Sequence, residues 1–151
     1  MRHFEIVRVT AENYPLFDAM VRWRMSGVEQ EPTLTTIPDE VLRELGTPGF
    51  TVYAACTDGR YVGWIALCYL PKIGKWKRGH LYVDELWVAE AYRRQGIGRA
   101  LMERAEELAR EMAVTGLRLY VNVENPGAGR LYESCGYRKN GTAEFMEKEL
   151  L

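Results

Sequence analysis

A glycine-bearing turn, placed between an apolar strand pattern and an amphipathic helix pattern, constrains the fold of this chain more than any other feature. The turn, Arg93 to Ala100, reads RRQGIGRA and follows the apolar stretch His80 to Val88. The first turn of a helix leaves backbone N–H groups without partners and carries partial positive charge. Gly96 and Gly98 remove side chains that would keep a ligand from those donors, and three arginines add charge. The segment predicts a site for a pyrophosphate group.

Two common nucleotide-binding patterns do not fit this turn. The chain has no G-x-x-x-x-G-K-[ST] sequence, so a Walker-type phosphate loop is not expected. A dinucleotide fingerprint requires a small residue at the position of Leu101. From these residues alone, a plain helix start with solvated arginines remains the alternative.

The order of elements along the chain predicts a mixed sheet in one α/β domain, residues 1–151. The apolar stripe after the turn gives a helix closed by Gly116, so strands 80–88 and 117–123 should form a parallel pair with a right-handed crossover. The other strands should be antiparallel, with helices flanking the sheet. Asp58-Gly59 and Asn140-Gly141 each predict a two-residue hairpin turn, because both positions need positive φ. We expect further strands at 5–9, 50–57, 60–70, 137–139 and 142–148, and helices after Thr10, at 39–45 and at 126–135.

Composition excludes several classes of protein. The chain has 151 residues, 47% hydrophobic and 27% charged, with a formal net charge of -1. These values are typical of a globular domain, and the charge provides no overall attraction to nucleic acid or anionic membranes. Apolar runs such as 64–70 are far shorter than the ~20 residues that span a bilayer, so no membrane association is expected.

Cysteine and histidine usage points to a reduced protein without a metal site. If Asp58-Gly59 forms the hairpin turn, Cys56 lies opposite Tyr61 and cannot reach Cys68. The three widely spaced cysteines therefore predict no disulfide framework and a cytoplasmic location. His3 and His80 are isolated, so no metal is expected.

Two motifs in this order resemble the GCN5-related N-acetyltransferase (GNAT) superfamily. Arg93-x-x-Gly96-x-Gly98 is similar to its pyrophosphate signature, and Asn125-x-x-Ala128-x-x-x-Tyr132, continuing to Gly136-Tyr137, is similar to its second motif. The resemblance covers roughly residues 5–148. It implies an N-acetyltransferase fold, acetyl-coenzyme A (acetyl-CoA) as co-substrate and a primary amine as acceptor.

The resemblance also assigns cofactor contacts. The backbone of Leu86 and Val88 should pair with the pantetheine arm like an added strand, and the Val88 amide should donate to the oxyanion. Asn125 has two roles open, a hydrogen bond to pantetheine or the N-cap of the helix that begins at Pro126. The full set of expected cofactor contacts is Leu86, Trp87, Val88, Arg93, Arg94, Gln95, Gly96, Ile97, Gly98, Arg99, Ala100, Asn125, Ala128 and Tyr132.

Tyr132 and Glu85 are the candidate catalytic residues. A phenol with a pKa near ~10 stays protonated at neutral pH, so Tyr132 can donate a proton to the leaving sulfur; the alternative is an aromatic packing its helix onto the sheet. Apolar residues change phase across Asp84-Glu85, which predicts a β-bulge. In similar proteins an acidic residue there faces the acceptor, so Glu85 is the candidate base or holds a water that is. Alternatively, Asp84 and Glu85 have only structural roles, as capping residues or in ion pairs with Lys75 or Arg78.

The acceptor side is less defined. Glu29, Glu31 and Asp39, together with Asp84, would suit a small cationic amine, although a solvated loop remains the alternative. The short tip at Asn140-Gly141 leaves room for a peptide amine. The basic run 72–78 could touch RNA or an acidic partner, but is more often a solvated loop, so nucleic acid is not the expected partner.

Two other classes of function stay open at this point. The first is a non-catalytic acyl-CoA sensor or partner-binding module with the same fold, and the second is an RNA-directed acyltransferase. The apolar strands also permit a homodimer, although no residue demands one.

Overall fold

The computed structural model describes residues 3–74 and 79–151, and the chain divides into two compact units. The first unit, Met1–Tyr120, contains the whole sheet, and the second, Val121–Leu151, contains one helix. Within the described residues, no helix is both long and apolar enough to cross a bilayer.

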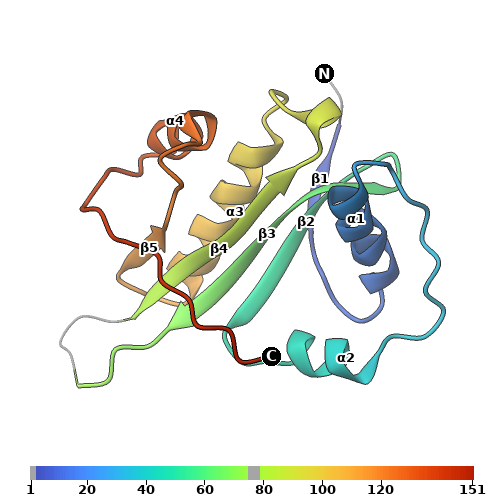
Figure 1. The fold of residues 1–151 in the computed structure, drawn as a ribbon, viewed down its shortest axis with the longest axis horizontal. Helices are drawn as coiled ribbons and strands as arrows, with labels where there is room; N and C mark the ends of the chain where they lie inside the picture. The colour runs from blue at the N-terminus through green and yellow to red at the C-terminus, as the bar shows by residue number, and fades with distance from the viewer. Residues whose placement is uncertain (1–2, 75–78) are drawn as a thin grey trace. The chain divides into compact units, whose positions relative to one another are not determined.

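The first unit is built on a five-stranded sheet in the order β1-β2-β3-β4-β5 (Figure 1). Strands β1 to β4 pair with one another in antiparallel fashion, and β5 pairs with β4 in parallel at one side of the sheet. This confirms the mixed sheet and the parallel strand–helix–strand unit expected from the sequence. The strands are β1 (Glu5–Arg8), β2 (Phe50–Thr57), β3 (Arg60–Leu70), β4 (His80–Val88) and β5 (Gly116–Leu119).

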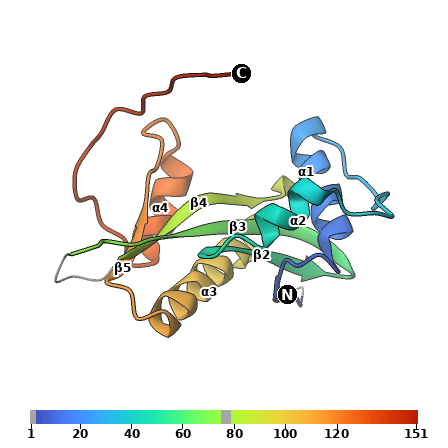
Figure 2. The same cartoon turned by 90° about the horizontal axis from the view of Figure 1, so that it is seen from below.

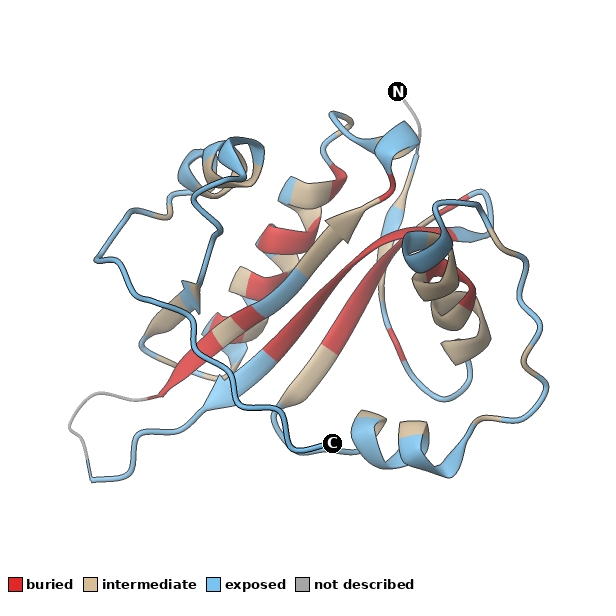
Figure 3. Cartoon of the chain, in the orientation of Figure 1, coloured by how far each residue is buried: buried red, intermediate tan, exposed pale blue. Residues whose placement is uncertain are grey.

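Helices cover both faces of this sheet. Figure 2 shows α1 (Tyr14–Ser26) and α2 (Asp39–Leu45) on one face and α3 (Ile97–Glu111) on the other. On the first face, Met20 of α1 packs with Val52, Trp64 and Ala66 of the sheet. On the second, Leu101 of α3 is fully buried. The central strands β2 and β3 are therefore the most deeply buried part of the molecule, as Figure 3 shows.

The first hairpin forms as its turn residues predict. Asp58 and Gly59 have φ values of 51° and 73°, which is the left-handed conformation that the turn requires. Cys56 lies opposite Tyr61, as expected, and Cys68 lies opposite Phe50. Cys56, Cys68 and Cys135 are all free thiols.

Two helix boundaries differ from the sequence prediction. Helix α1 begins at Tyr14 after Asn13, and the N–H of Thr10 donates to the Asn13 side-chain oxygen at 2.7 Å, so Thr10 is not the N-cap. Helix α3 ends at Glu111, and Ala113 takes the left-handed conformation with φ of 54°. Gly116, expected to close α3, is the first residue of β5.

The second unit contains α4 (Pro126–Ser134) and no strand. The predicted hairpin of 137–139 and 142–148 is therefore wrong, and β5 stops at Leu119 instead of reaching Val123. Of the turn residues, Gly141 has a positive φ and Asn140 does not, so the expected turn does not form. Phe145 and Met146, adjacent in sequence and both 85% exposed, would point to opposite faces of a strand, so neither face would gain a continuous apolar surface.

Candidate active site

Strand β4 carries the predicted β-bulge. Ala66 of β3 lies opposite Glu85, whereas the next residue, Leu67, lies opposite Val83, so Asp84 is the extra residue. Because Ala66 belongs to the core beneath α1, its partner Glu85 also lies on the α1 face of the sheet. Asp84 and Glu85 are both exposed. The bulge therefore presents two carboxylates on β4 without burying either of them.

Beyond the bulge, β4 has a strand partner on one side only within the first unit. Pairing with β5 ends at Val83, whereas pairing with β3 continues to Val88. The N–H of Ala89 donates to the carbonyl of Val62 at 2.8 Å, so it points toward β3. Backbone groups alternate in direction along a strand, so those of Val88 and Leu86 point away from β3. These are the residues expected to pair with a pantetheine arm.

The turn between β4 and α3 has an unusual backbone. After the short helix η1 (Glu90–Tyr92), Arg93 is extended, with φ of -72° and ψ of 160°. Arg94 has φ of 61° and Gly96 has φ of 86°. Positive φ is uncommon for a residue with a side chain. Backbone N–H groups in such alternating conformations form a concave site that favours anions.

The start of α3 supplies further donors. The N–H of Ala100 makes the first intrahelical bond, to the carbonyl of Gly96 at 3.0 Å. The amides of Ile97, Gly98 and Arg99 precede it, in the turn where helices lack internal acceptors. A Cβ built on Gly96 would meet no atom within 4 Å, so the space beside this residue is open. The turn thus has the donor-rich, open geometry that an anion such as a pyrophosphate requires.

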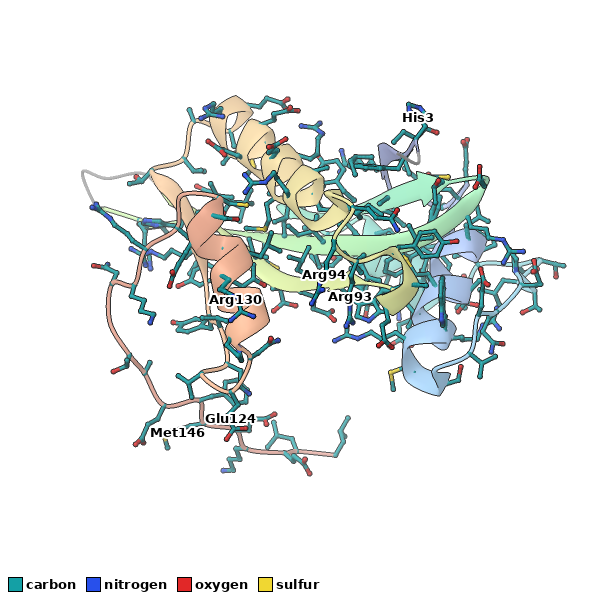
Figure 4. The ribbon with its side chains drawn as sticks, turned by 90° about the horizontal axis from the view of Figure 1, so that it is seen from above. His3, Arg93, Arg94, Glu124, Arg130 and Met146 are labelled. Carbon is teal, nitrogen blue, oxygen red and sulfur yellow. The ribbon has the colours of Figure 1, made fainter. Side chains whose placement is uncertain are left out.

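Two arginines of the turn differ in their contacts. The Arg93 side chain donates from Nε to the carbonyl of Val88 at 2.9 Å, which ties the turn to the end of β4. Arg93 and Arg94 are both exposed, and Figure 4 shows them on the segment between β4 and α3. Gln95 donates from Nε2 to the carbonyl of Ala91 at 3.4 Å. Arg93 and Gln95 therefore also stabilise the turn itself.

Glu85 is ion-paired across the sheet face. Arg24 of α1 donates from Nη1 to Oε2 of Glu85 at 2.9 Å. The Cζ atom of the same guanidinium lies 5.2 Å from the ring centroid of Trp64, within cation–π range. The alternative partners considered for Glu85, Lys75 and Arg78, lie outside the described residues, as does most of the basic run 72–78. Arg24 was not anticipated from the sequence.

An aromatic cluster extends from Trp64, the ring that Arg24 contacts. The ring centroids of Trp64 and Trp87 are 5.1 Å apart, and those of Trp87 and Trp23 are 5.9 Å apart. Trp23 in turn contacts Tyr92 of η1, with centroids 6.3 Å apart. The side chain of Trp87, expected at the cofactor, thus belongs to this cluster. The cluster connects α1 with the segment that leads into the anion-binding turn.

The acidic residues expected at the acceptor lie apart from the bulge. Glu29 and Glu31 both pair with Arg60, at 2.5 Å and 3.0 Å, beside the β2–β3 hairpin. Six positions of β3 separate Arg60 from Ala66, the partner of Glu85. At about 3.3 Å per residue this is roughly 20 Å, so the three glutamates do not form one cluster. Asp39 begins α2.

The second unit holds the remaining predicted residues. The side-chain oxygen of Asn125 accepts from the amide of Ala128 at 3.2 Å, so the N-cap role considered for Asn125 is realised. Tyr132 is half-buried on α4, and burial raises the pKa of its phenol above the ordinary value. Its ring lies 6.2 Å from that of Tyr137, centroid to centroid. A raised pKa keeps the phenol protonated, as a proton donor requires.

In residues 3–74 and 79–151, no group of three or more His, Cys, Asp or Glu side chains is arranged to hold a metal ion. Two arginines that pair with predicted acidic residues, Arg24 and Arg60, were not anticipated from the sequence. Their partners lie 61 and about 30 positions away in sequence, so no local pattern could have revealed them.

Comparison with known proteins agrees with the fold and with the turn. A family model described as "Acetyltransferase (GNAT) family" matches residues 16–137. This range includes the bulge of β4, the glycine-bearing turn and all of α4. The chain therefore belongs to the GNAT acetyltransferase family.

Individual relatives match over different extents. Acetyltransferase Atu2258 of Agrobacterium fabrum is 44% identical over 70 residues, covering 46% of this chain and 50% of the relative. The chain thus spans about half the length of this relative. A thialysine N-epsilon-acetyltransferase of Caenorhabditis elegans is 22% identical over 91% of this chain and 84% of its own.

Among solved structures, an aminoglycoside acetyltransferase has the same fold. This protein, meta-AAC0020 from an uncultured soil metagenomic sample, was solved in complex with trehalose. It superimposes with a TM-score of 0.82 and 19% identity, covering 98% of this chain and 97% of the other.

Proposed function

We propose that this chain is an acetyl-CoA-dependent N-acetyltransferase acting on the primary amine of a small cationic molecule. The observation that carries the proposal is the joint geometry of β4 and the turn after it. The open backbone of Leu86 and Val88 leads directly to the donor-rich start of α3, and Arg93 joins the two through the Val88 carbonyl. This arrangement suits an extended thioester arm attached to a pyrophosphate.

In this proposal the cofactor contacts divide by chemical part. The amides from Gly96 to Arg99, with the arginines of the turn, bind the pyrophosphate, whereas the Ala100 amide already donates to the Gly96 carbonyl. The backbone of Leu86 and Val88 hydrogen-bonds the pantetheine arm as an added strand would. Ala128 and Asn125 of α4 belong to the second family motif, and Asn125 already caps α4, so its role toward the cofactor is secondary.

The chemistry requires the amine nitrogen to lose two protons and the leaving thiolate to gain one. A lysine-like amine has a pKa near ~10.4, so it must lose a proton before it can attack. Glu85, or a water that it holds, accepts this proton before the N–C bond forms. The nitrogen of the tetrahedral intermediate loses its second proton to solvent as the amide forms. The Val88 amide donates to the oxyanion of the tetrahedral intermediate. As the C–S bond breaks, Tyr132 gives its proton to the leaving thiolate, and the raised pKa of its phenol suits that role.

The named relatives support an amine acceptor. The family is one of acetyltransferases, one relative is a thialysine N-epsilon-acetyltransferase, and the structural neighbour is an aminoglycoside acetyltransferase. Aminoglycosides and thialysine both carry amines, which supports transfer to nitrogen. For this chain we propose only that the acceptor is a small amine. We also propose that it forms a single N-acetyltransferase domain and that the reaction needs no metal. The three free thiols suit a cytoplasmic location.

Initial rates of thiol release from acetyl-CoA test the proposal. The panel comprises polyamines, aminoglycosides, amino acids and peptide N-termini. Direct attack in a ternary complex predicts double-reciprocal lines that intersect when both substrates are varied. Parallel lines would indicate an acetylated enzyme and contradict direct attack. Saturable acetyl-CoA binding without turnover on any acceptor would favour an acyl-CoA sensor instead.

A further inference from the structure

Charges on the acceptor side are more balanced than the sequence suggests. Glu29 and Glu31 share the guanidinium of Arg60, and Glu85 is paired with Arg24. Only one of the three carboxylates is therefore left without a compensating positive charge.

A second arginine lies on the same face as Glu85. Tyr82 lies opposite Cys68, two positions from Ala66, so Tyr82 and Glu85 face the same side of the sheet. Arg118 is the parallel partner of Tyr82, and its hydrogen bond to the Tyr82 phenol lowers the pKa of that group. The face that presents Glu85 thus carries positive as well as negative groups.

Arg24 is held in a way that leaves it able to bind a ligand. Among the described residues, Arg24 contacts the Glu85 carboxylate through Nη1 and the face of the Trp64 ring. The aromatic face fixes the guanidinium plane without using its N–H groups. The side chains of Arg24 and Glu85 are 40% and 47% exposed. Exposed ion pairs contribute only about 0–1 kcal/mol, so a ligand can compete for both groups.

From this arrangement we infer that Arg24 determines specificity, selecting acceptors that carry a carboxylate as well as an amine. The inference rests on the proposed acetyl transfer at Glu85. The acceptor's carboxylate binds the Arg24 guanidinium, which matches its geometry, while its amine approaches Glu85. Such an acceptor replaces the Arg24–Glu85 ion pair by two ion pairs, one between its carboxylate and Arg24 and one between its amine and Glu85. A purely cationic acceptor can engage the exposed Glu85 carboxylate, of which Arg24 contacts only Oε2, but it has no group that binds Arg24.

Matched acceptors that differ only in the carboxylate test this inference. Lysine and cadaverine form one pair, and ornithine and putrescine another. We expect kcat/KM to be about tenfold or more higher for the carboxylated member, as one charge-assisted hydrogen bond would give. The Arg24→Gln variant should abolish this ratio, mainly through KM of the carboxylated member. Arg24→Lys should restore part of it, whereas Arg110→Gln on α3 should leave it unchanged.

The ratio within each pair isolates the carboxylate, because any effect of Arg24 on Glu85 acts on both members. Equal kcat/KM for the two members, or an Arg24→Gln loss that is the same for both, would overturn the inference.

A binding measurement separates this inference from the proposed reaction. Arg24 lies over the Trp64 ring, which contacts Trp87 and through it Trp23, so acceptor binding to the CoA-bound protein should change tryptophan fluorescence. If no acceptor releases thiol, yet lysine changes the fluorescence and cadaverine does not, acetyl transfer fails and the specificity of Arg24 stands. If the amino acid and the diamine of each pair bind equally well, the inference fails whatever the turnover.

Discussion

The guanidinium of Arg24 and the carboxylate of Glu85 lie 2.9 Å apart, although they are 61 residues apart in the sequence. The contact joins helix α1 to the bulge of β4. Because Trp64 lies beneath the same guanidinium, the position of the candidate base depends on α1 as well as on the sheet. Substitutions in α1 should therefore affect turnover without touching the cofactor.

Removal of the Tyr132 hydroxyl should slow the reaction. If the phenol protonates the leaving thiolate, Tyr132→Phe should lower kcat by about 10²–10⁴-fold, the usual contribution of a general acid. Acetyl-CoA affinity, measured by titration calorimetry, should hardly change. Tyr137→Phe, which removes a hydroxyl from the neighbouring ring, is the matched control. Unchanged turnover in Tyr132→Phe would eliminate it as the acid.

The pH dependence of kcat should reflect the raised pKa of Tyr132. Burial disfavours the phenolate, so the protonated form needed for catalysis persists to higher pH than for an ordinary tyrosine. We therefore expect activity to rise with pH as the amine loses its proton, with no decline below about pH 10. A decline near neutral pH that disappears in Tyr132→Phe would contradict this assignment.

Gly96 and Gly116 allow a test of the turn conformation. A Cβ at either residue would meet no atom within 4 Å, but only Gly96 has a positive φ, of 86°. Gly96→Ala should lower the free energy of unfolding by about 1–2 kcal/mol, the cost of the left-handed conformation for a residue with a Cβ. It should also weaken acetyl-CoA binding, because the strained turn will misplace the amides. Gly116→Ala should change neither thermal unfolding nor affinity appreciably.

Arg94 should contribute charge to pyrophosphate binding. It is exposed on the turn, so Arg94→Gln should raise the Kd of acetyl-CoA several-fold and reduce its dependence on salt concentration. Arg110→Gln removes a comparable exposed charge from the far end of α3 and provides the control. If both variants have the same Kd and the same salt dependence, Arg94 does not contact the pyrophosphate.

The C-terminal segment offers a test that is independent of activity. Residues 138–151 are exposed and make no backbone hydrogen bond within the described parts of the chain. Their amides should exchange with deuterium within seconds, whereas those of buried β3 should remain protected far longer. Protection in two stretches around Asn140-Gly141 would instead indicate the hairpin that the sequence suggests.

Local sequence patterns predicted much of the first unit. The bounds of β2 and β3 follow from the Asp58-Gly59 turn between them, and the bulge of β4 follows from a change of phase across Asp84-Glu85. Both signals depend on a few neighbouring residues. The hairpin at Asn140-Gly141 failed because its signal is equally local, while strand formation needs a partner and a continuous apolar face. Arg24 and Arg60 could not be predicted, because their ion pairs depend on how distant segments pack.

The central claim is transfer of an acetyl group from acetyl-CoA to an amine nitrogen. It is tested most directly by measuring, in one reaction, the thiol released and the N-acetylated acceptor identified by mass spectrometry. With the unsubstituted protein, we predict that free CoA and the amide form in equal amounts. Both products should be lost together in Tyr132→Phe. Thiol release without an amide, or no release with any acceptor despite tight acetyl-CoA binding, would contradict the claim.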